Sequence, residues 1–505
     1  MWRRVLKPMG IGLFVALRAA SVSASPDAPP PPVMVPDSAA EIITEYERAM
    51  TTGRFGDALT SLDKMQLDSS NSKGRALLDV MRAAALLGLK RDAEAQKLIA
   101  ESDKLAPQLP EASSGLFVGA LLTNHIEIAA DALDRMIARF PDAVRELDWQ
   151  SMRYFIVNEP KTDKQRNDDR QIALAQLGYG GDTERGHYIA KGAVDLLVGR
   201  GDFKAANDLL PYVKEPQAVE NMLIQKRFAA LWPTLEELAG PHLEKIRDAA
   251  VTAAEREYEA TPSDEQALAN YANTLRHSGR LNEAIALRSK LPASSAAMSS
   301  ADEDMGWAVN NVAVALHQAG RKDEADQLFA LLNDAPMPKE YWRVSMKINR
   351  LEFLVLDGRF EKALQLMEPT AKVEGSPYAE QLVRRLRYCS LSQLGRTAEA
   401  DKYKADLLAH ASDAPGPTID GLLCAGDLDA AERVALTGLA NPDVEKRTDF
   451  EEDFVRQLQQ HRLTGDDPSV WQGRWSELRK RPAITAAFDR LGRDMPESLL
   501  PTKEN

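Results

Sequence analysis

The chain has 505 residues, of which 44% are hydrophobic, 28% charged and only 6% aromatic, and its formal net charge is −13. This is enough apolar material for a large core, yet no apolar run reaches the roughly 18–20 residues that a transmembrane helix needs. The excess of acid argues against a nucleic-acid partner, and two cysteines are too few for a disulfide framework.

The N-terminal segment has the three parts of a secretory signal. Arg3, Arg4 and Lys7 precede an apolar stretch from Met9 to Leu17, and small residues up to Ala24 then supply a cleavage site. A cytosolic N-terminal helix is the alternative, but the proline-rich sequence that follows does not suit it. We therefore expect residues 1–24 to be a signal peptide that is removed on export.

The mature chain would begin with a proline-rich linker over residues 25–37, which predicts a stiff, extended spacer. Ser38 followed by Glu41 has the spacing of a capping box, so the first helix is expected there. With 59 basic and 76 acidic residues, the mature chain would carry a formal charge of −17 and no integral membrane span.

From residue 38 to about residue 440, a glycine at the end of an apolar run is followed five residues later by an alanine. Asparagine replaces the glycine once, and it is the other residue that tolerates a left-handed backbone. The pairs are Gly53/Ala58, Gly88/Ala93, Asn124/Ala129, Gly201/Ala206, Gly279/Ala284, Gly320/Ala325, Gly358/Ala363, Gly395/Ala400 and Gly426/Ala431. Two intervals are about twice the others, which predicts a degenerate unit in each, turning near Gly178–Gly186 and near Gly240.

The residues around each pair predict a helical hairpin. Apolar residues stand seven and four positions before every glycine, and large apolar residues usually stand eight or nine positions after it. Spacings of three and four place them on one face of a helix before the turn and one face after it. A small alanine allows the two helices to cross closely, and because one hairpin cannot bury both of its faces, neighbouring hairpins must stack.

These features resemble tetratricopeptide repeats over most of residues 40–440, most closely over 264–440. The resemblance is divergent, because Lys347 and Arg384 stand where the family has a large apolar residue early in the first helix. It implies an all-α, right-handed α-solenoid of about 11 antiparallel helix pairs over residues 38–440, some of them degenerate. HEAT-like or other helical repeats are the alternative.

The family binds peptides or partner proteins in a concave groove lined by the first helices, so the resemblance implies partner-binding residues there. A carboxylate clamp of the family's usual kind is not expected, because Ala269 takes the place of its lysine and Asn349 that of its arginine. We expect ordinary polar groove residues, and the candidates are Asn270, Asn273, Arg276, Asn310, Asn311 and Asn349.

Residues 441–505 differ from the repeats, with an acidic cluster in "TDFEEDF" and a basic one in "RWSELRKRP". Opposite charges of this kind are typical of a solvated helix pair. We expect a C-terminal helical cap that shields the apolar end of the stack from water.

No motif indicates catalysis, a cofactor or a metal. None of the seven histidines lies in a metal-binding spacing, and His277 and His317 are expected to be ordinary turn residues. Cys389 lies six residues before Gly395 and Cys424 only two before Gly426, so equivalent helices would place them one turn out of register. That argument predicts no disulfide, although an oxidising compartment would favour one.

Together these features predict an exported bacterial protein, periplasmic or secreted, that is a non-catalytic scaffold for a protein or peptide partner. The alternatives are a structural component of an envelope assembly or polysaccharide-export machine and, third, an enzyme or an enzyme's accessory subunit.

Overall fold

The computed structural model describes most of the chain, namely residues 37–65, 71–159, 163–181, 183–299, 301–333, 341–367, 376–459 and 472–500. The predicted signal peptide and all of the linker before Asp37 lie outside these residues. The described chain consists of α-helices and short 3-10 helices, with one isolated antiparallel bridge between Gln225 and Gly492. None of the described helices is both long enough and apolar enough to cross a membrane.

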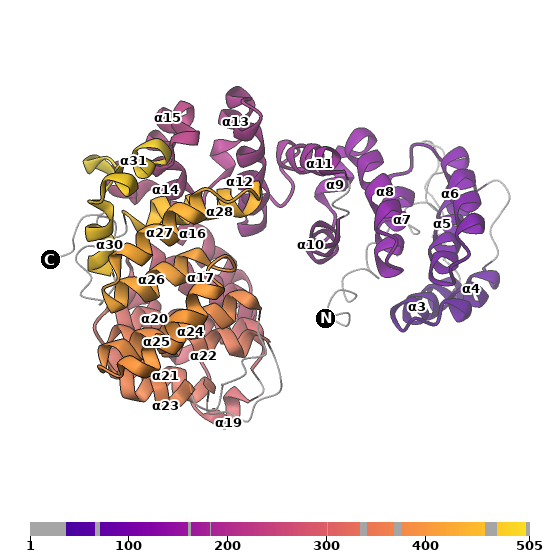
Figure 1. Ribbon diagram of the computed structural model, residues 1–505. Helices are drawn as coiled ribbons and strands as arrows, with labels where there is room; N and C mark the ends of the chain where they lie inside the picture. The colour runs from indigo at the N-terminus through magenta and orange to yellow at the C-terminus, as the bar shows by residue number, and fades with distance from the viewer. Residues whose placement is uncertain are drawn as a thin grey trace. The chain divides into compact units, whose positions relative to one another are not determined.

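The chain forms two compact units, Met1–Tyr212 and Val213–Asn505, and each is described by itself. The hairpins of unit 1 join a first and a second helix (Figure 1): α3 (Asp37–Thr51) with α4 (Phe55–Asp63), α5 (Ser72–Gly88) with α6 (Asp92–Leu105), α7 (Pro110–Leu122) with α8 (Ile126–Arg139), and α12 (Glu184–Gly199) with α13 (Phe203–Leu209). The first long interval holds α9 (Pro141–Arg145), α10 (Trp149–Asn158) and α11 (Lys164–Gln176), and η1 (Leu210–Tyr212) ends the unit.

Unit 2 begins irregularly, with α14 (Pro216–Ile224), η2 (Lys226–Leu231), α15 (Trp232–Ala239), η3 (Pro241–Leu243) and α16 (Glu244–Ala260). Five hairpins follow: α17 (Glu265–His277) with α18 (Leu281–Ala286), α20 (Glu303–Gln318) with α21 (Lys322–Asn333), α22 (Tyr341–Leu356) with α23 (Phe360–Met367), α24 (Pro377–Gln393) with α25 (Thr397–Ala409), and α26 (Pro415–Ala425) with α27 (Leu428–Leu439). The connection from α18 to α20 holds η4 (Leu287–Lys290) and α19 (Ser295–Met298). The unit ends with α28 (Val444–Gln457), α30 (Gln472–Arg479), α31 (Pro482–Leu491) and η6 (Glu497–Leu499). The predicted all-α solenoid of stacked antiparallel hairpins is confirmed.

A left-handed residue ends the first helix of each hairpin. At Gly279, φ is +78°, its N–H donates to the carbonyl of Arg276 at 3.1 Å, and the N–H of Arg280 reaches back to Leu275 at 2.9 Å. These bonds satisfy carbonyls that the helix end would otherwise leave unpaired. The same conformation occurs at six more of the predicted glycines and at one asparagine: Gly53, Gly201, Gly320, Gly358, Gly395, Gly426 and Asn124. Positive φ also occurs at both turns predicted for the degenerate units, at Gly178, Gly180, Gly181 and Gly240.

Gly88 is the exception, and the prediction that it forms a repeat turn is wrong. Gly88 still belongs to α5, where an added Cβ would overlap the ring of Phe55, and the left-handed residue is Lys90, with φ of +59°. The crossing alanine is correspondingly Ala95, which is fully buried, whereas Ala93 is exposed. The glycine is needed for close packing, and the turn two residues later tolerates a lysine.

An ion pair marks the same turn independently of the glycine. In five hairpins the arginine directly after the left-handed residue pairs with an acid three residues further on: Arg54–Asp57, Arg91–Glu94, Arg280–Glu283, Arg321–Glu324 and Arg396–Glu399. These pairs are exposed and contribute little to stability. They are useful as a sequence signal, because Arg91 and Glu94 place the second turn at Lys90 without reference to Gly88.

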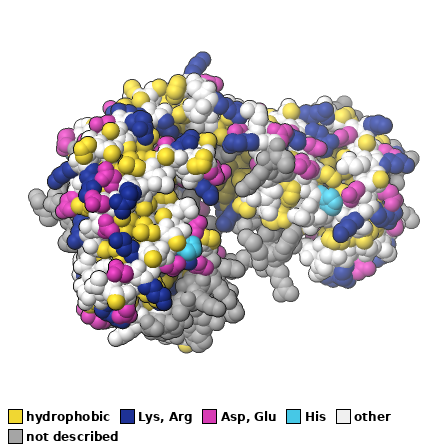
Figure 2. Space-filling view, viewed as in Figure 1, with side chains coloured by type: hydrophobic (Ala, Val, Ile, Leu, Met, Phe, Trp, Pro, Cys, Tyr) yellow, Lys and Arg dark blue, Asp and Glu magenta, His cyan; other side chains and the backbone are white. Residues whose placement is uncertain are grey.

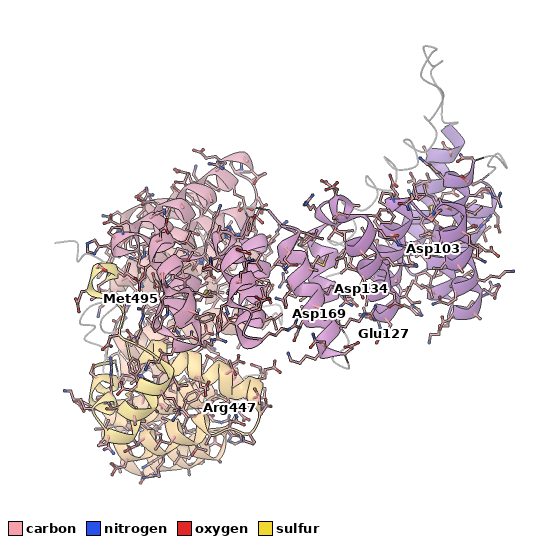
Figure 3. All side chains as sticks on the ribbon, turned by 90° about the horizontal axis from the view of Figure 1, so that it is seen from above. Asp103, Glu127, Asp134, Asp169, Arg447 and Met495 are labelled. Carbon is pink, nitrogen blue, oxygen red and sulfur yellow. A yellow bond between two sulfur atoms is a disulfide. The ribbon has the colours of Figure 1, made fainter. Side chains whose placement is uncertain are left out.

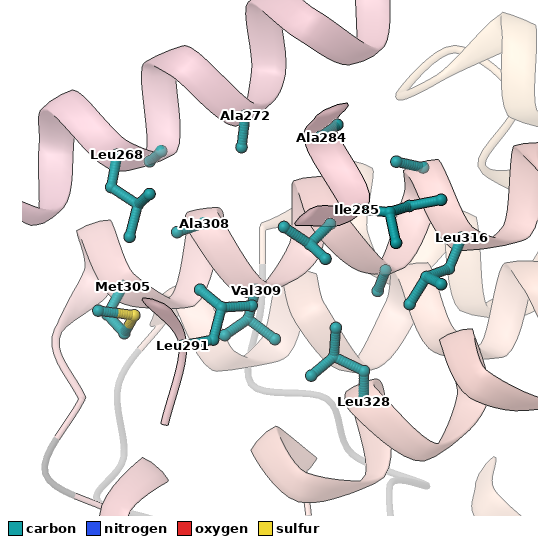
Figure 4. Packing of buried hydrophobic residues seen from close by; sticks show 14 of the residues in the cluster. Leu268, Ala272, Ala284, Ile285, Leu291, Met305, Ala308, Val309, Leu316 and Leu328 are labelled. Atoms are coloured by element: carbon teal, nitrogen blue, oxygen red, sulfur yellow. The ribbon is translucent and has the colours of Figure 1, made fainter. Parts of the chain in front are cut away.

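Buried alanines and larger apolar residues form the core of unit 2. In Figure 4, Ala272, Ala284 and Ala308 lie among leucine and valine side chains of neighbouring helices. All three alanines have no solvent exposure. The absence of bulk at these positions lets the helix axes approach, and Leu268 and Leu316 fill the space beside them.

Ion pairs link successive parts of unit 1 along the chain. Figure 3 shows Asp103, Asp134 and Asp169 in succession along the unit. Each carboxylate pairs with an arginine of a following helix: Arg135 with Asp103 at 2.7 Å, Arg166 and Arg170 with Asp134 at 2.7 and 2.6 Å, and Arg200 with Asp169 at 2.5 Å. Desolvation opposes the negative charge of Asp134, but its two guanidinium partners outweigh it and lower the pKa of that carboxyl group.

The C-terminal helices of unit 2 contact its N-terminal helices. The backbone N–H of Arg493 donates to the carbonyl of Ile224 at 2.9 Å, and its side chain donates to the carbonyl of Leu223 at 2.6 Å and to Glu236 at 2.7 Å. Its guanidinium also lies 3.6 Å from the ring centre of Trp232. One arginine therefore joins residues about 260 positions apart in the sequence.

Other contacts join the same two segments, residues 216–245 and the C-terminal helices, and we call these contacts together the seam. Arg227 and Asn221 both donate to Glu452 at 3.2 Å, and a ring nitrogen of His242 lies 2.7 Å from the carbonyl of Leu500. Figure 1 shows α31 beside α14 and α15. At the other end of the unit, α30 and α31 pack against α26 and α27. The C-terminal segment thus contacts the irregular helices that precede the hairpins of unit 2 as well as its last repeat.

We predict that Ala284→Arg destabilises unit 2 by roughly 3 kcal/mol, because a large charged side chain would have to enter a filled crossing point. Thermal unfolding would show this as a lowered midpoint. Ala286→Arg is the matched control, since Ala286 lies on the same helix and is exposed. Equal midpoints for the two variants would contradict the assigned crossing.

We predict that Arg493→Ala lowers the free energy of unfolding by about 2–3 kcal/mol, the scale of charged hydrogen bonds together with a cation–π contact. Hydrogen exchange measures where the loss occurs. If the seam is as described, exchange accelerates in residues 216–245 as well as in 482–500. Arg490→Ala removes the same charge from an exposed position on α31 and should leave both regions unchanged.

Candidate partner-binding face

The first helices of unit 2 pack against one another in sequence order, α17 on α20, α20 on α22, α22 on α24 and α24 on α26. Polar side chains on these helices meet between neighbours. We call this row of side chains, with the residues exposed beside it, the first-helix face. Its members come from five separate repeats, so only stacking brings them together.

Three of the predicted partner-binding residues bond within the stack. Asn349 donates to the side-chain oxygen of Asn310 at 2.8 Å, and Asn311 donates to the carbonyl of Ala269 at 3.2 Å. Asn310 and Asn311 are each 6% exposed. These amides tie α17, α20 and α22 together, and partner binding by them stays a prediction.

The other three candidates lie on α17 and are partly exposed. The carbonyl of Asn270 accepts a bond from Thr274 at 2.8 Å, and the side-chain oxygen of Asn273 accepts one from Arg276 at 3.0 Å. Burial lowers the pKa of Arg276 to about 10. This end of the face therefore presents a guanidinium group in an environment that disfavours its charge.

A charged network crosses the other end of the face. Arg385 pairs with Glu352 at 2.8 Å and with Asp420 at 2.9 Å, and the indole N–H of Trp475 donates to Asp420 at 2.9 Å. Arg385 and Trp475 are almost completely buried. The network joins α22, α24 and α26 to α30, so the C-terminal segment is held directly on the first-helix face.

Asp420 is the member of this network whose pKa is raised by burial. Burial raises its pKa to about 6, and the nearby carboxylates of Asp453 and Glu352 add to the effect, while Arg385 and Trp475 oppose it. Two acids besides Asp420 thus make the local potential more negative. Arg385 and Trp475 bind the carboxylate of Asp420 directly and so favour its ionised form.

Two aromatic side chains are exposed beside the polar row. Trp307 is 37% exposed and lies three residues before Asn310 on α20, and Tyr378 is 54% exposed and lies seven residues before Arg385 on α24. Such spacings place residues on the same side of a helix. Aromatic rings beside fixed polar groups are typical of the anchor points of protein interfaces. No signal other than their type would have singled them out from the sequence.

The two cysteines form a disulfide, Cys389–Cys424, with Cα atoms 5.5 Å apart. The argument from register that predicted no bridge is therefore wrong. Both cysteines are fully buried between α24 and α26, and the carbonyl of Cys424 accepts bonds from Gln393 at 2.6 Å and from Arg474 at 2.8 Å.

A stagger between α24 and α26 explains the error. Arg385 and Asp420, like the two cysteines, are 35 residues apart, whereas the corresponding glycines are only 31 apart. When α24 and α26 are aligned by the glycines that follow them, the residues that touch are therefore displaced by about one helical turn. Gly421 allows this close approach, since a Cβ there would lie 3.0 Å from Leu407 and 3.4 Å from Arg385.

The histidines of this region have internal partners. His317 bonds to Asp357 at 2.9 Å, and Lys322 pairs with the same carboxylate at 2.7 Å. A ring nitrogen of His277 lies 3.0 Å from the carbonyl of Asn273. Over the described residues, no three side chains of histidine, cysteine, aspartate or glutamate are grouped as metal ligands would be.

Charged side chains of both signs are mixed on the face that Figure 2 shows. Figure 2 shows basic and acidic side chains interspersed over the visible surface, with hydrophobic side chains scattered between them. Such mixing keeps a protein soluble without a strong field of one sign.

We predict that ionisation of Asp420 destabilises the fold. Its folded pKa lies above the unfolded value of 3.8, so the folded state binds more protons, and stability falls as the pH rises from about 4 to about 7. A shift of this size corresponds to roughly 3 kcal/mol. Asp420→Asn should remove that part of the pH dependence in chemical unfolding.

The control for this prediction is Asp449→Asn, at an exposed position on α28. If the wild type and Asp420→Asn lose stability in parallel over this pH range, the burial of Asp420 is not the cause.

No family model matches the chain, and no curated protein matches its sequence. Among solved structures, the crystal structure of the P58(IPK) TPR domain matches with 12% sequence identity, over 80% of this chain and 100% of that one, at a TM-score of 0.21. Chains with so low a TM-score do not superpose as wholes. The turn and crossing geometry described above therefore identifies the fold, and by that geometry the chain is a solenoid of TPR-like hairpins.

Proposed function

We propose that this chain is a non-catalytic scaffold of the bacterial cell envelope that binds a partner protein on the first-helix face of unit 2. The observation that carries the proposal is the pairing of exposed Trp307 and Tyr378 with a row of polar groups held in place by the stack. Aromatic anchors contribute most when their surroundings are rigid, because little side-chain entropy is then lost on binding.

Rigidity has identified sources in this face. Hydrogen bonds of asparagine side chains join α17, α20 and α22. The ion pairs of Arg385 join α22, α24 and α26, and the disulfide links α24 to α26. Helices tied in this way present the same spacing of side chains before and after binding. This arrangement suits recognition of an extended protein segment that runs across several repeats.

The envelope location rests on the sequence. A basic, then apolar, then small-residue N-terminus predicts export, and the disulfide is compatible with an oxidising compartment. The formal net charge of −13 disfavours nucleic acid and anionic lipid, and it is compatible with a protein or peptide partner.

We predict that photo-crosslinking groups placed at Trp307 and Tyr378 capture one and the same protein from envelope extract. In a pull-down with the mature chain and no crosslinking groups, Trp307→Ala combined with Tyr378→Ala should reduce recovery of that protein at least tenfold, as loss of two anchors of about 1–2 kcal/mol each implies. Tyr188→Ala is the matched control, because Tyr188 is 60% exposed but belongs to unit 1.

Two outcomes would contradict the proposal. One is capture that is equally efficient from Tyr188 and from the first-helix face. The other is repeated failure to capture any protein together with turnover of a small molecule by the purified mature chain.

A further inference from the structure

Arg276 has only neutral partners. Its guanidinium donates to Asn273 at 3.0 Å and to a ring nitrogen of His277 at 2.9 Å, and its Nε is buried without a hydrogen-bond partner. Within the described residues, no carboxylate pairs with it. Arg280 and Arg385 of the same unit, by contrast, each have an acidic partner.

A second arginine lies close by on the neighbouring helix. Arg247 of α16 pairs with Glu220 at 2.7 Å through one terminal nitrogen, but its Nε is likewise buried without a partner. The helices α16 and α17 pack against each other. Burial first, and then the positive charges of Arg276 and Arg247, lower the pKa of His277 to about 4, so both arginines act on one neutral ring.

The local balance of charge is therefore incomplete. Two guanidinium groups face one carboxylate, and both keep an unused N–H donor in a site that water reaches poorly. A buried cation without a counter-ion is unfavourable. The carboxyl-terminal end of α17 offsets part of the charge of Arg276, because the helix dipole is negative there, but it supplies no acceptor for Nε.

We infer that Arg276 and Arg247, with the amide of Asn273, form an oxyanion site between α16 and α17 that takes a carboxylate of the partner protein. A carboxylate offers two acceptors in the plane of the guanidinium fork and neutralises the excess charge. The site differs from a carboxylate clamp of the repeat family, since Ala269 and Asn349 occupy the clamp's charged positions. The inference rests on the proposed function, because the carboxylate comes from the same partner that contacts Trp307 and Tyr378.

Arg276→Met tests the site, because methionine keeps much of the bulk and removes the charge. If Arg276 serves binding, the free variant unfolds at the same temperature as the wild type or higher, since an uncompensated cation has been removed. If Arg276 serves only the fold, the midpoint falls. Arg280→Met is the control: Arg280 lies four residues away, is exposed and is paired with Glu283.

Anions probe the site directly. At constant ionic strength, replacing chloride by acetate or by inorganic phosphate should raise the unfolding midpoint of the wild type and of Arg280→Met by about 2 °C or more, and leave Arg276→Met unchanged. The same shift in all three proteins, or in none, would overturn the inference.

The source of the carboxylate is decided by capture of the crosslinked partner. Loss of the partner from Arg276→Met, with retention by Arg280→Met, supports a carboxylate of the partner. An anion-dependent shift with unchanged capture makes this a site for a free small anion and overturns the inference while the proposed function stands. An anion-dependent shift without any captured protein overturns the inference too, and the proposed function falls with it.

Discussion

The fold depends on one local constraint, the reversal of the chain between two helices that cross closely. A left-handed residue satisfies the end of the first helix, and a buried alanine five positions later removes the bulk that would separate the helix axes. Because a hairpin built in this way leaves an apolar face uncovered, it can be stable only beside another hairpin. The stack, and every contact between repeats, follows from that requirement.

Stacking also creates the features that matter for binding. Asn349 reaches Asn310, Arg385 reaches Glu352 and Asp420, and none of these contacts lies within a single hairpin. The C-terminal segment then joins the ends of unit 2, so that its repeats are not free to change curvature one at a time. A face with fixed curvature can hold a partner at several points at once.

The sequence predicted the hairpins well because their determinants are local. It placed the turn wrongly at Gly88, where a glycine needed for packing against Phe55 resembled a glycine needed for a turn. The ion pair of Arg91 with Glu94 carried the correct register. The disulfide was missed for a different reason: alignment by turns assumes that neighbouring helices are level, whereas α24 and α26 are staggered by one turn.

The sequence by itself determined the class of fold, the helical hairpin and most of its turns, since these depend on residues within about ten positions of one another. The resemblance to tetratricopeptide repeats also marked Asn273 and Arg276 as candidates, because they lie on the first helix of a hairpin. Only the tertiary structure decided which polar groups are paired, which aromatic rings stay exposed, and that Arg276 has no carboxylate partner among the described residues. Those properties depend on the stagger between helices and on the closure of unit 2, which are set by packing between residues tens to hundreds of positions apart.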